Sequence, residues 1–378
     1  MAQKLNAVFQ HLSDCGLNIV EASSMIEVMF KSNTNCFFWG NPGIGKTESV
    51  IQFVSKMRLE DPNFGFWYMT LAHLDPTDLS GLPTFGEEEV NGKVIKVTKW
   101  AVPDFFPKDP NARGVLFLDE YNNASGAVQN ACQQLIQERR IGDYKLPDGV
   151  FIIAAGNPTG QNAFSTELSA PTRNRFAHFY VKADFDLWAD YFLSQRLDPE
   201  VTKTILGFLV QNRQYFEDTD AMDKGELNYG TPRNWMKAAK ILSKNWNQSD
   251  DLIGSIVSGF IGNEGGQSFK EYKKDMGRYQ DPLEIINGKD FRDNDDISLY
   301  KTMYGVYATL YGWLDDQSKH KDIEKGIKNL FAAAKKAKKA DFMTATATRI
   351  SNSQLISFAD FANYIEAGKV VKEAKNKE

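Results

Sequence analysis

The sequence CFFWGNPGIGKTESV at residues 36–50 places four apolar residues, a glycine-rich turn and a lysine–threonine pair in direct succession. Residues 40–47 fit the pattern G-x-x-x-x-G-K-[ST] in full. Glycines let the backbone N–H groups of such a turn point at phosphate oxygens, and the helix that follows adds its positive N-terminal end. The stretch therefore predicts a buried strand, a phosphate-binding loop and a helix.

The loop residues have predicted roles in holding a nucleotide. Lys46 is expected to reach the β- and γ-phosphates, and the Thr47 hydroxyl to ligate Mg²⁺. A chance glycine-rich turn is the simpler alternative, but the strand before it and the helix-forming residues after it favour the phosphate loop. The predicted nucleotide-binding residues of this segment are Gly40, Asn41, Pro42, Gly43, Ile44, Gly45, Lys46, Thr47 and Glu48.

The composition is typical of a folded protein without a strong charge preference. The 378 residues are 42% apolar and carry a net charge of −5, which gives no overall attraction to nucleic acid or anionic membranes. Three cysteines are too few for a disulfide framework or a zinc cage. No apolar run approaches the roughly 20 residues of a membrane span, and the start does not resemble a signal peptide. We expect a cytoplasmic protein with no membrane contact.

Short apolar runs alternate with helical segments in the first half of the chain. This pattern indicates an α/β fold with a mainly parallel five-stranded sheet. Asn91-Gly92, between flanking valines, adds a β-hairpin insert. A helical segment is expected before the first run, with apolar positions at Val8, Phe9 and Leu12. The expected strands are residues 36–39, 66–70, 115–118, 151–155 and 176–181.

Helical periodicity replaces the strand pattern after residue 183. We predict an α/β domain over residues 1–183, a helical domain over 184–250 and a mostly helical C-terminal extension of unknown role over 251–378. Within the extension, residues 263–284 are polar and predicted to be rich in turns, whereas residues 297–314 are apolar enough to pack.

Two carboxylates end the third apolar run, GVLFLDE. Ligands of open α/β sheets bind at the carboxyl ends of the strands, where Asp119 and Glu120 are expected to lie. Asp119 is predicted to hold Mg²⁺ through water, and Glu120 to orient or deprotonate an attacking water. The adjacent glutamate favours hydrolysis over transfer to a bound acceptor.

The next run, VFIIAAGNP, ends at Asn157. Its neutral side chain is expected to hydrogen-bond the same water or the γ-phosphate. An Asn-Pro turn is the simpler interpretation of this residue by itself. The two neighbouring strand ends favour the catalytic role.

Three arginines lie in two later segments, LSAPTRNRF and YGTPRNW. Arg173 and Arg175 are candidate arginine fingers, which would stabilise phosphoryl-transfer charge in a neighbouring subunit. The sequence does not decide between them, and a surface ion pair is the alternative for both. Arg233 begins a predicted helix of the second domain and is expected to reach the nucleotide; a solvated helix face is its alternative.

In this order the motifs resemble those of the AAA+ ATPases, specifically the MoxR and dynein/midasin-related branch. GNPGIGKT is similar to Walker A, VLFLDE to Walker B, IIAAGNP to sensor 1, LSAPTRNRF to the arginine-finger segment and TPRNW to sensor 2. The resemblance covers roughly residues 15–245. Many MoxR proteins have Asp-Arg-Phe where this chain has Thr-Arg-Asn-Arg-Phe, so the finger assignment stays open.

The resemblance implies a homo-oligomeric ring, usually a hexamer, with Mg²⁺-ATP at subunit junctions. Hydrolysis in such rings rotates the lid domain and remodels or assembles a protein partner in a chaperone-like role. The partner often carries a von Willebrand factor A domain.

Two other functions share the phosphate loop. A nucleic-acid motor or restriction-type subunit of the same branch could use the lysine-rich residues 319–339. That segment is less favoured because aromatic residues for base stacking do not alternate with its charges. A kinase or GTPase is disfavoured by the Asp-Glu pair, the asparagine strand end and the arginine-bearing helical domain.

Overall fold

The computed structural model describes residues 16–90, 92–158, 168–275, 279–351 and 353–358. The predicted helical positions Val8, Phe9 and Leu12 and the turn residue Asn91 lie outside these ranges. The chain divides into two compact units, Met1–Asp184 and Phe185–Glu378. Each unit is described by itself.

Five parallel strands form the centre of the first unit, in the order β2-β5-β8-β1-β9. In the register, Cys36 of β1 lies between Ile153 of β8 and Ala177 of β9. The predicted α/β class with a parallel five-stranded sheet is therefore confirmed. The strands are β1 (Cys36–Trp39), β2 (Gly65–Thr70), β5 (Arg113–Asp119), β8 (Gly149–Gly156) and β9 (Ala177–Tyr180).

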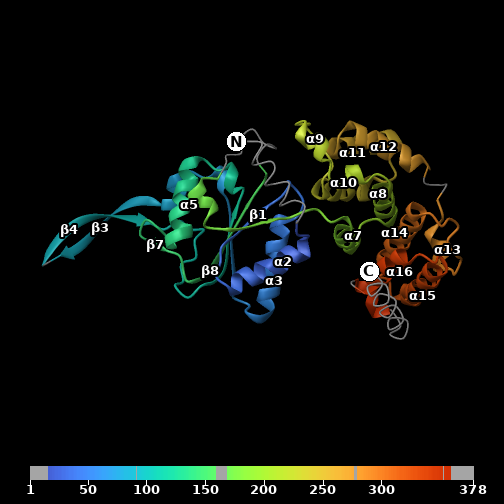
Figure 1. Ribbon diagram of the computed structural model, residues 1–378, viewed down its shortest axis with the longest axis horizontal. Coiled ribbons are helices and arrows are strands. Elements are labelled where there is room, and N and C mark those ends of the chain that lie inside the picture. Colours follow the sequence, from blue (N-terminus) through green and yellow to red (C-terminus); the bar gives the residue numbers. More distant parts are fainter. Residues whose placement is uncertain (1–15, 91, 159–167, 276–278, 352, 359–378) are drawn as a thin grey trace. The chain divides into compact units, whose positions relative to one another are not determined.

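Helices cover both faces of this sheet, which gives three layers (Figure 1). Alternate strand side chains enter two separate cores: Phe37 and Leu116 pack on the side of α5, and Phe38 and Phe117 pack on the side of α2 and α3. Because both faces are buried, the strands are continuous apolar runs in the sequence. The covering helices are α2 (Ile19–Lys31), α3 (Lys46–Glu60) and α5 (Gly126–Glu138).

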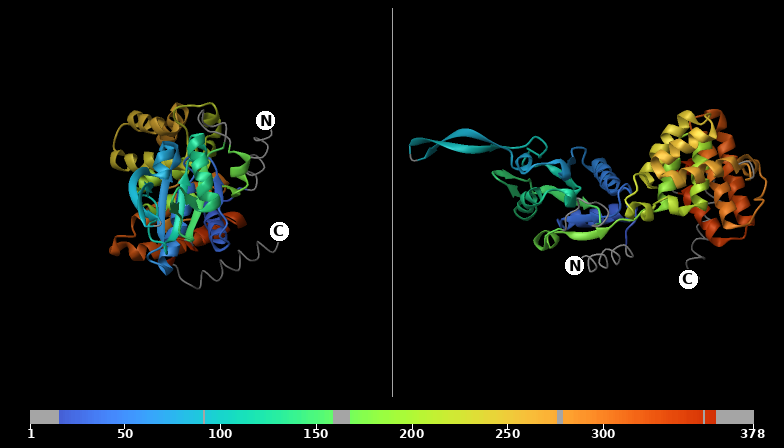
Figure 2. Two further views of the ribbon diagram at one scale, coloured as in Figure 1. Left: turned by 90° about the vertical axis from the view of Figure 1, so that its left-hand side faces the viewer. Right: turned by 90° about the horizontal axis from the view of Figure 1, so that it is seen from above.

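The predicted hairpin insert is present between β2 and β5. Its strands β3 (Leu82–Val90) and β4 (Lys93–Ala101) pair in antiparallel register, with Val90 opposite Lys93. The hairpin extends away from the sheet of its own unit (Figures 1 and 2), and most of its side chains are exposed. The smaller elements of this unit are α4 (Pro76–Ser80), β6 (Arg140–Ile141), β7 (Tyr144–Lys145) and α6 (Ala170–Arg173).

The described part of the second unit is helical. Helix α14 is buried over most of its length and packs against α7, α8, α13, α15 and α16. The helices are α7 (Phe185–Ser194), α8 (Pro199–Gln211), α9 (Thr219–Asp223), α10 (Pro232–Asn245), α11 (Asp250–Ile261), α12 (Asn263–Lys274), α13 (Pro282–Ile286), α14 (Asp296–Gly312), α15 (His320–Lys336) and α16 (Ala340–Ser351). The division near residue 250 stays a prediction; α8 and α14, which lie on opposite sides of it, pack against each other.

The turn-rich interpretation of residues 263–284 is wrong for its first half, which forms helix α12. Gly266 explains the difference, because a Cβ at this position would lie 2.0 Å from the Ser258 hydroxyl oxygen. The glycines that suggested turns instead allow α12 to pack closely against α11. Tertiary packing overrides the low helix propensity of glycine here. No helix within the described ranges is long and apolar enough to cross a membrane.

Candidate active site

The loop of residues 40–45 joins β1 to α3 at the carboxyl end of the sheet. Gly43 and Gly45 have φ values of 78° and 109°, which favour glycine. A Cβ on Gly40 would lie 2.5 Å from the Val181 carbonyl oxygen, so position 40 also requires glycine. The chain therefore turns tightly and enters α3 at Lys46, followed by Thr47 and by Glu48 in the first helical turn.

The Lys46 ammonium connects the loop to the end of a neighbouring strand. It donates hydrogen bonds to the Gly40 carbonyl at 2.6 Å, the Asn41 carbonyl at 2.9 Å and the Asn157 side-chain oxygen at 2.8 Å. Asn157 directly follows β8 and is 9% exposed. The structure thus brings together two predicted site residues that are 111 positions apart in the sequence.

Asp119, the last residue of β5, accepts hydrogen bonds through both carboxylate oxygens. Oδ2 accepts from the Thr47 hydroxyl at 3.2 Å and from the Tyr68 hydroxyl at 3.0 Å, and Oδ1 accepts from the Glu120 N–H at 2.9 Å. Glu120 has the left-handed backbone conformation, with φ 53° and ψ 36°. Such a conformation costs of order 1–3 kcal/mol in a residue other than glycine and clusters at functional sites.

Tyr68 is a site residue that the sequence reasoning missed. It lies on β2, which pairs with β5 and brings Thr70 opposite Asp119. Burial, followed by the nearby Asp119 and Glu120 charges, raises the pKa of the Tyr68 phenol, so the hydroxyl keeps its proton at neutral pH. The only sequence signal is a polar group two residues before the end of a strand.

Asn122 is the second residue that was missed. Its buried side chain donates to the Asn157 carbonyl at 2.7 Å and accepts from the Asn157 N–H at 3.2 Å. These paired bonds fix the end of β8 against the segment that follows β5. A Cβ on Gly156 would lie 2.3 Å from the Asn122 side-chain oxygen, so the glycine before Asn157 makes this contact possible.

The two candidate finger arginines lie in different environments. Arg173, at the end of α6, is exposed and donates through Nη1 to the Leu168 carbonyl at 2.9 Å. Arg175 is half-buried and donates through Nη2 to Gln137 of α5, while its Nη1 atom is buried without a hydrogen-bond partner. Arg173 is therefore the one that is open to solvent.

A histidine connects the arginine segment to the strand before the loop. The Trp39 indole N–H donates to His178 Nδ1 at 2.9 Å, and His178 Nε2 lies 2.9 Å from the Arg173 carbonyl. Because Nδ1 accepts, the neutral ring carries its proton on Nε2 and donates to that carbonyl. Burial lowers the pKa of His178, which favours this neutral form.

Arg233 is exposed and lies in the second unit, at the second residue of helix α10. Thr231 caps this helix by accepting a hydrogen bond from the Asn234 N–H at 3.1 Å. The structure therefore confirms a helix start at this position. The predicted contact between Arg233 and a nucleotide stays a prediction.

The comparisons with known proteins identify the part of the chain that carries these residues. A model of the AAA domain (dynein-related subfamily) matches residues 35–176. This part of the chain is an AAA domain. The match includes the loop, Asp119, Glu120, Asn157, Arg173 and Arg175, and it confirms the resemblance to the dynein-related branch for these residues.

No curated protein matches the chain. A predicted ATPase from Cytophaga hutchinsonii is 14% identical, with 71% of this chain and 84% of that chain covered and a TM-score of 0.33. A RuvB mutant from Thermotoga maritima is 16% identical, with 71% and 74% covered and a TM-score of 0.34. A full-length MCM homologue from Methanopyrus kandleri is 14% identical, with 66% and 53% covered and a TM-score of 0.25. Similarities at these scores support no conclusion about the AAA domain.

Proposed function

We propose that the AAA domain binds Mg²⁺-ATP at residues 40–48 and hydrolyses it. The observation that carries this proposal is the contact of Lys46 with Asn157 and of Thr47 with Asp119, across 111 and 72 positions of the sequence. These contacts place an ammonium, a hydroxyl, a carboxylate and an amide around the start of one helix. Such a set is suited to a nucleotide with its metal ion.

The donor atoms fit a magnesium ion and phosphates. Mg²⁺ binds through oxygen ligands, usually one or two from the protein, with phosphates and water completing the shell. The Thr47 hydroxyl, directly, and the Asp119 carboxylate, through water, would hold the ion; the hydroxyl oxygen and Asp119 Oδ2 lie 3.2 Å apart. When bound, Mg²⁺ neutralises developing phosphate charge. Lys46 holds phosphate oxygens, and the N–H groups at the start of α3 point toward the same anion.

Glu120 is the proposed general base. Its carboxylate takes a proton from water as the water oxygen bonds to the γ-phosphorus and the bond to the leaving ADP oxygen breaks. Asn157 would orient that water or the γ-phosphate, and Asn122 would hold Asn157 in place. Tyr68 would fix the orientation of Asp119 by donating to its carboxylate.

We propose further that the chain works as a homo-oligomeric ring, usually six subunits in its branch, which remodels or assembles a protein partner. Arg173, which is exposed, is the first candidate, because its side chain would give up only its hydrogen bond to the Leu168 carbonyl to reach a neighbouring subunit. Arg175 is the second candidate. Arg233 would act on the nucleotide from the helical unit. A protein with a von Willebrand factor A domain is one candidate partner.

The alternative is a nucleic-acid motor acting through the lysine-rich residues 319–339. The structure does not favour it, because Lys319, Lys328, Lys336 and Lys339 each form an ion pair with a carboxylate. These pairs neutralise half of the eight lysines in that segment. Stimulation of ATP hydrolysis by DNA or RNA would favour the motor over the protein-remodelling function.

Two variants test the proposed chemistry. We expect Lys46→Ala to abolish ATP binding, and Glu120→Gln to retain binding while lowering turnover by about 10²–10⁴-fold, the usual contribution of a general base. Binding is measured with a fluorescent ATP analogue, and turnover by phosphate release. Arg113→Gln, an exposed residue at the opposite end of β5, is the matched control. Wild-type turnover by Glu120→Gln would contradict the assignment of the base.

Rings assembled from two kinds of variant subunit test whether a neighbouring subunit contributes the arginine finger. We expect Arg173→Ala subunits to hydrolyse ATP poorly alone, because every junction lacks the guanidinium. Adding Glu120→Gln subunits, which retain Arg173, should restore activity at mixed junctions. No gain at any mixing ratio would refute supply from the neighbour by Arg173. Repeating the series with Arg175→Ala separates the two candidates.

The partner is tested with the trapped state. Tagged Glu120→Gln protein with ATP should retain a protein partner that Lys46→Ala protein does not retain. A partner captured equally by both variants would show that capture is independent of nucleotide.

A further inference from the structure

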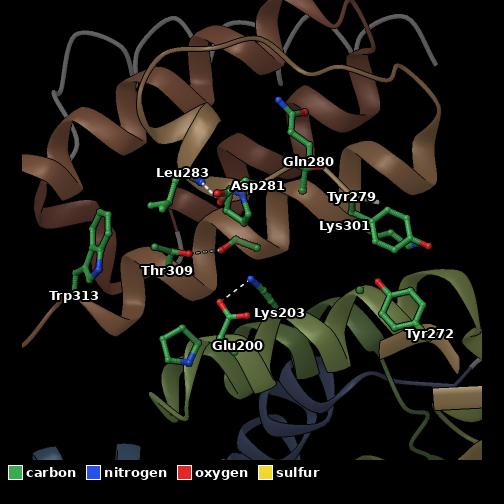
Figure 3. A pocket seen from close by; sticks show the side chains of 15 residues that line it. Glu200, Lys203, Tyr272, Tyr279, Gln280, Asp281, Leu283, Lys301, Thr309 and Trp313 are labelled. Carbon is green, nitrogen blue, oxygen red and sulfur yellow. Dashed lines mark hydrogen bonds and ion pairs between the residues drawn. The ribbon is translucent and has the colours of Figure 1, made fainter. Parts of the chain in front are cut away.

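The helical unit contains a cavity of about 500 Å³ that the AAA domain does not share. It lies between α8 on one side and α13 and α14 on the other (Figure 3). On α14 the lining positions include Lys301, Gly305 and Thr309, which recur every four residues and so share one helix face; Trp313, which also lines the cavity, directly follows the helix. A cavity of this size accommodates a small organic molecule.

Lys301 is the unusual member of the lining. Its side chain is 7% exposed, and its ammonium donates one hydrogen bond, to the Gln211 side-chain oxygen at 2.6 Å. The ammonium also lies over two aromatic rings, 3.9 Å from the centre of Tyr279 and 4.9 Å from that of Tyr272. Among the described residues, no carboxylate forms an ion pair with Lys301. A buried cation is therefore held by a neutral amide and by ring faces.

A buried charge without an ion-pair partner is costly, and the protein retains it here, with the carboxylate of Asp295 acting on it only from a longer distance. Burial lowers the pKa of Lys301 to about 8, so the ammonium is still the main form at neutral pH. An anion in the cavity would supply the missing charge, and charge-assisted hydrogen bonds are about twice as strong as neutral ones.

The rest of the lining suits a flat apolar body. Figure 3 shows Lys301, Tyr272 and Tyr279 at one end of the cavity and Trp313 at the other. Gly207 on α8 and Gly305 on α14 also line the cavity, and they allow Tyr272 and Pro282 to pack closely against the two helices. Aromatic side chains hold flat rings by stacking or edge contacts.

The other lysine that lines the cavity, Lys203 of α8, is already paired with a carboxylate. Lys203 forms an ion pair with Glu200 at 2.6 Å, and both line the cavity. Asp281 also lines it and caps α13 by accepting from the Leu283 N–H at 2.9 Å. Of the charged groups around the cavity, only the Lys301 cation is buried without a carboxylate partner among the described residues.

We propose that this cavity binds a small organic anion with a flat apolar body, whose carboxylate or phosphate pairs with Lys301. This site is independent of the nucleotide chemistry proposed for the AAA domain. It would make the helical unit a sensor for a small anionic metabolite.

The test uses 2-naphthoate and its neutral analogue 2-naphthalenemethanol, titrated into the full chain by calorimetry. We expect 2-naphthoate to bind at least tenfold more tightly, because only it carries a charge for Lys301. Both titrations are repeated with ADP, so that binding at residues 40–48 is recognised by competition. Equal affinities, no binding of 2-naphthoate at millimolar concentration, or displacement by ADP would overturn the proposal.

Lys301→Met is the decisive variant, because it keeps the length of the side chain and removes the charge. We expect it to abolish the preference for 2-naphthoate. The matched control is Lys240→Met, an exposed lysine of α10 outside the cavity, which should keep that preference. An unchanged preference in Lys301→Met would refute the pairing.

Circular dichroism checks that Lys301→Met folds. If it does not, Thr309→Phe replaces it, since a ring at this half-buried position would fill the cavity from α14. Loss of 2-naphthoate binding in that variant supports the site, and retained binding opposes it.

Discussion

Asn122→Ala is expected to destabilise the active site, although it changes no residue of the nucleotide-binding motifs. The change removes both hydrogen bonds to the backbone of Asn157, at 2.7 and 3.2 Å. The donor and the acceptor that remain are buried, and each unsatisfied group costs about 1–3 kcal/mol. The two together give about 2–6 kcal/mol, and water entering the vacated space would bring the cost to the lower end of that range.

Three measurements test this expectation. Urea unfolding should show an earlier first transition, and hydrogen exchange should speed up in the peptide that contains β8 and Asn157, because the Asn157 N–H loses its acceptor. ATP affinity should fall as well, since Asn157 holds the Lys46 ammonium at 2.8 Å. A fall in stability with unchanged ATP affinity would show that Asn122 has only a structural role.

The neighbouring residue provides a matched control. Asn123 is half-buried, and its side-chain oxygen is buried without a hydrogen-bond partner. Asn123→Ala therefore removes no hydrogen bond of that oxygen, and we expect a change within about 0.5 kcal/mol. If Asn122→Ala destabilises the protein no more than Asn123→Ala does, the proposed role of the paired bonds is wrong.

Three further expectations follow from the site. Tyr68→Phe removes a donor to Asp119 and should weaken Mg²⁺-dependent ATP binding about two- to tenfold, in line with the net contribution of about 0.5–1.5 kcal/mol of a typical hydrogen bond; unchanged binding in a magnesium titration would contradict this. Gly40→Ala should unfold the loop or abolish ATP binding, because the new Cβ would lie 2.5 Å from a backbone carbonyl oxygen; normal binding by a folded variant would count against the tight turn. His178 has a lowered pKa, so its contribution to stability is present above its ordinary pKa of 6.5 and is lost as pH falls toward the lowered value. His178→Gln should therefore show a smaller drop in melting temperature between pH 7.5 and 5.5 than the wild type, and equal drops would show that the lowered pKa of His178 does not contribute to the pH dependence of stability.

Much of the AAA domain could be predicted from sequence because its strands are buried on both faces. The run at residues 36–39 coincides with β1, and the other four runs fall on β2, β5, β8 and β9 to within two residues at each end. A continuous apolar run bounded by turn residues is a local signal, and parallel strands place their carboxyl ends at one edge. Residues that follow those ends are therefore predictable as neighbours.

The contacts that stabilise the site could not be predicted in the same way. Tyr68 and Asn122 are ordinary polar residues of a strand and a turn, and their partners are fixed only by the register of β2 with β5 and of β5 with β8. Gly266 shows the opposite case, in which a residue typical of turns lies within a helix because another helix packs closely against it. The contacts of Tyr68 and Asn122 and the helical position of Gly266 depend on segments that are distant in the sequence. A local sequence pattern contains no information about such segments.

Two hydrogen bonds connect the phosphate-binding loop to the segment that contains Arg173. Nucleotide binding at the loop is therefore expected to affect the position of Arg173. Trp39 directly precedes Gly40 and donates to His178, and His178 donates to the carbonyl of Arg173. A shift of the loop on nucleotide binding would therefore reach the exposed arginine through one indole and one imidazole, both held by β1 and β9 in parallel register. Arg175 has no such connection among the hydrogen bonds described, because its side chain is held by Gln137 of α5. In the proposed ring, the nucleotide-bound state of one subunit would thus be communicated to its neighbour through Arg173. His178→Gln should then weaken the cooperativity of ATP hydrolysis while leaving ATP affinity unchanged.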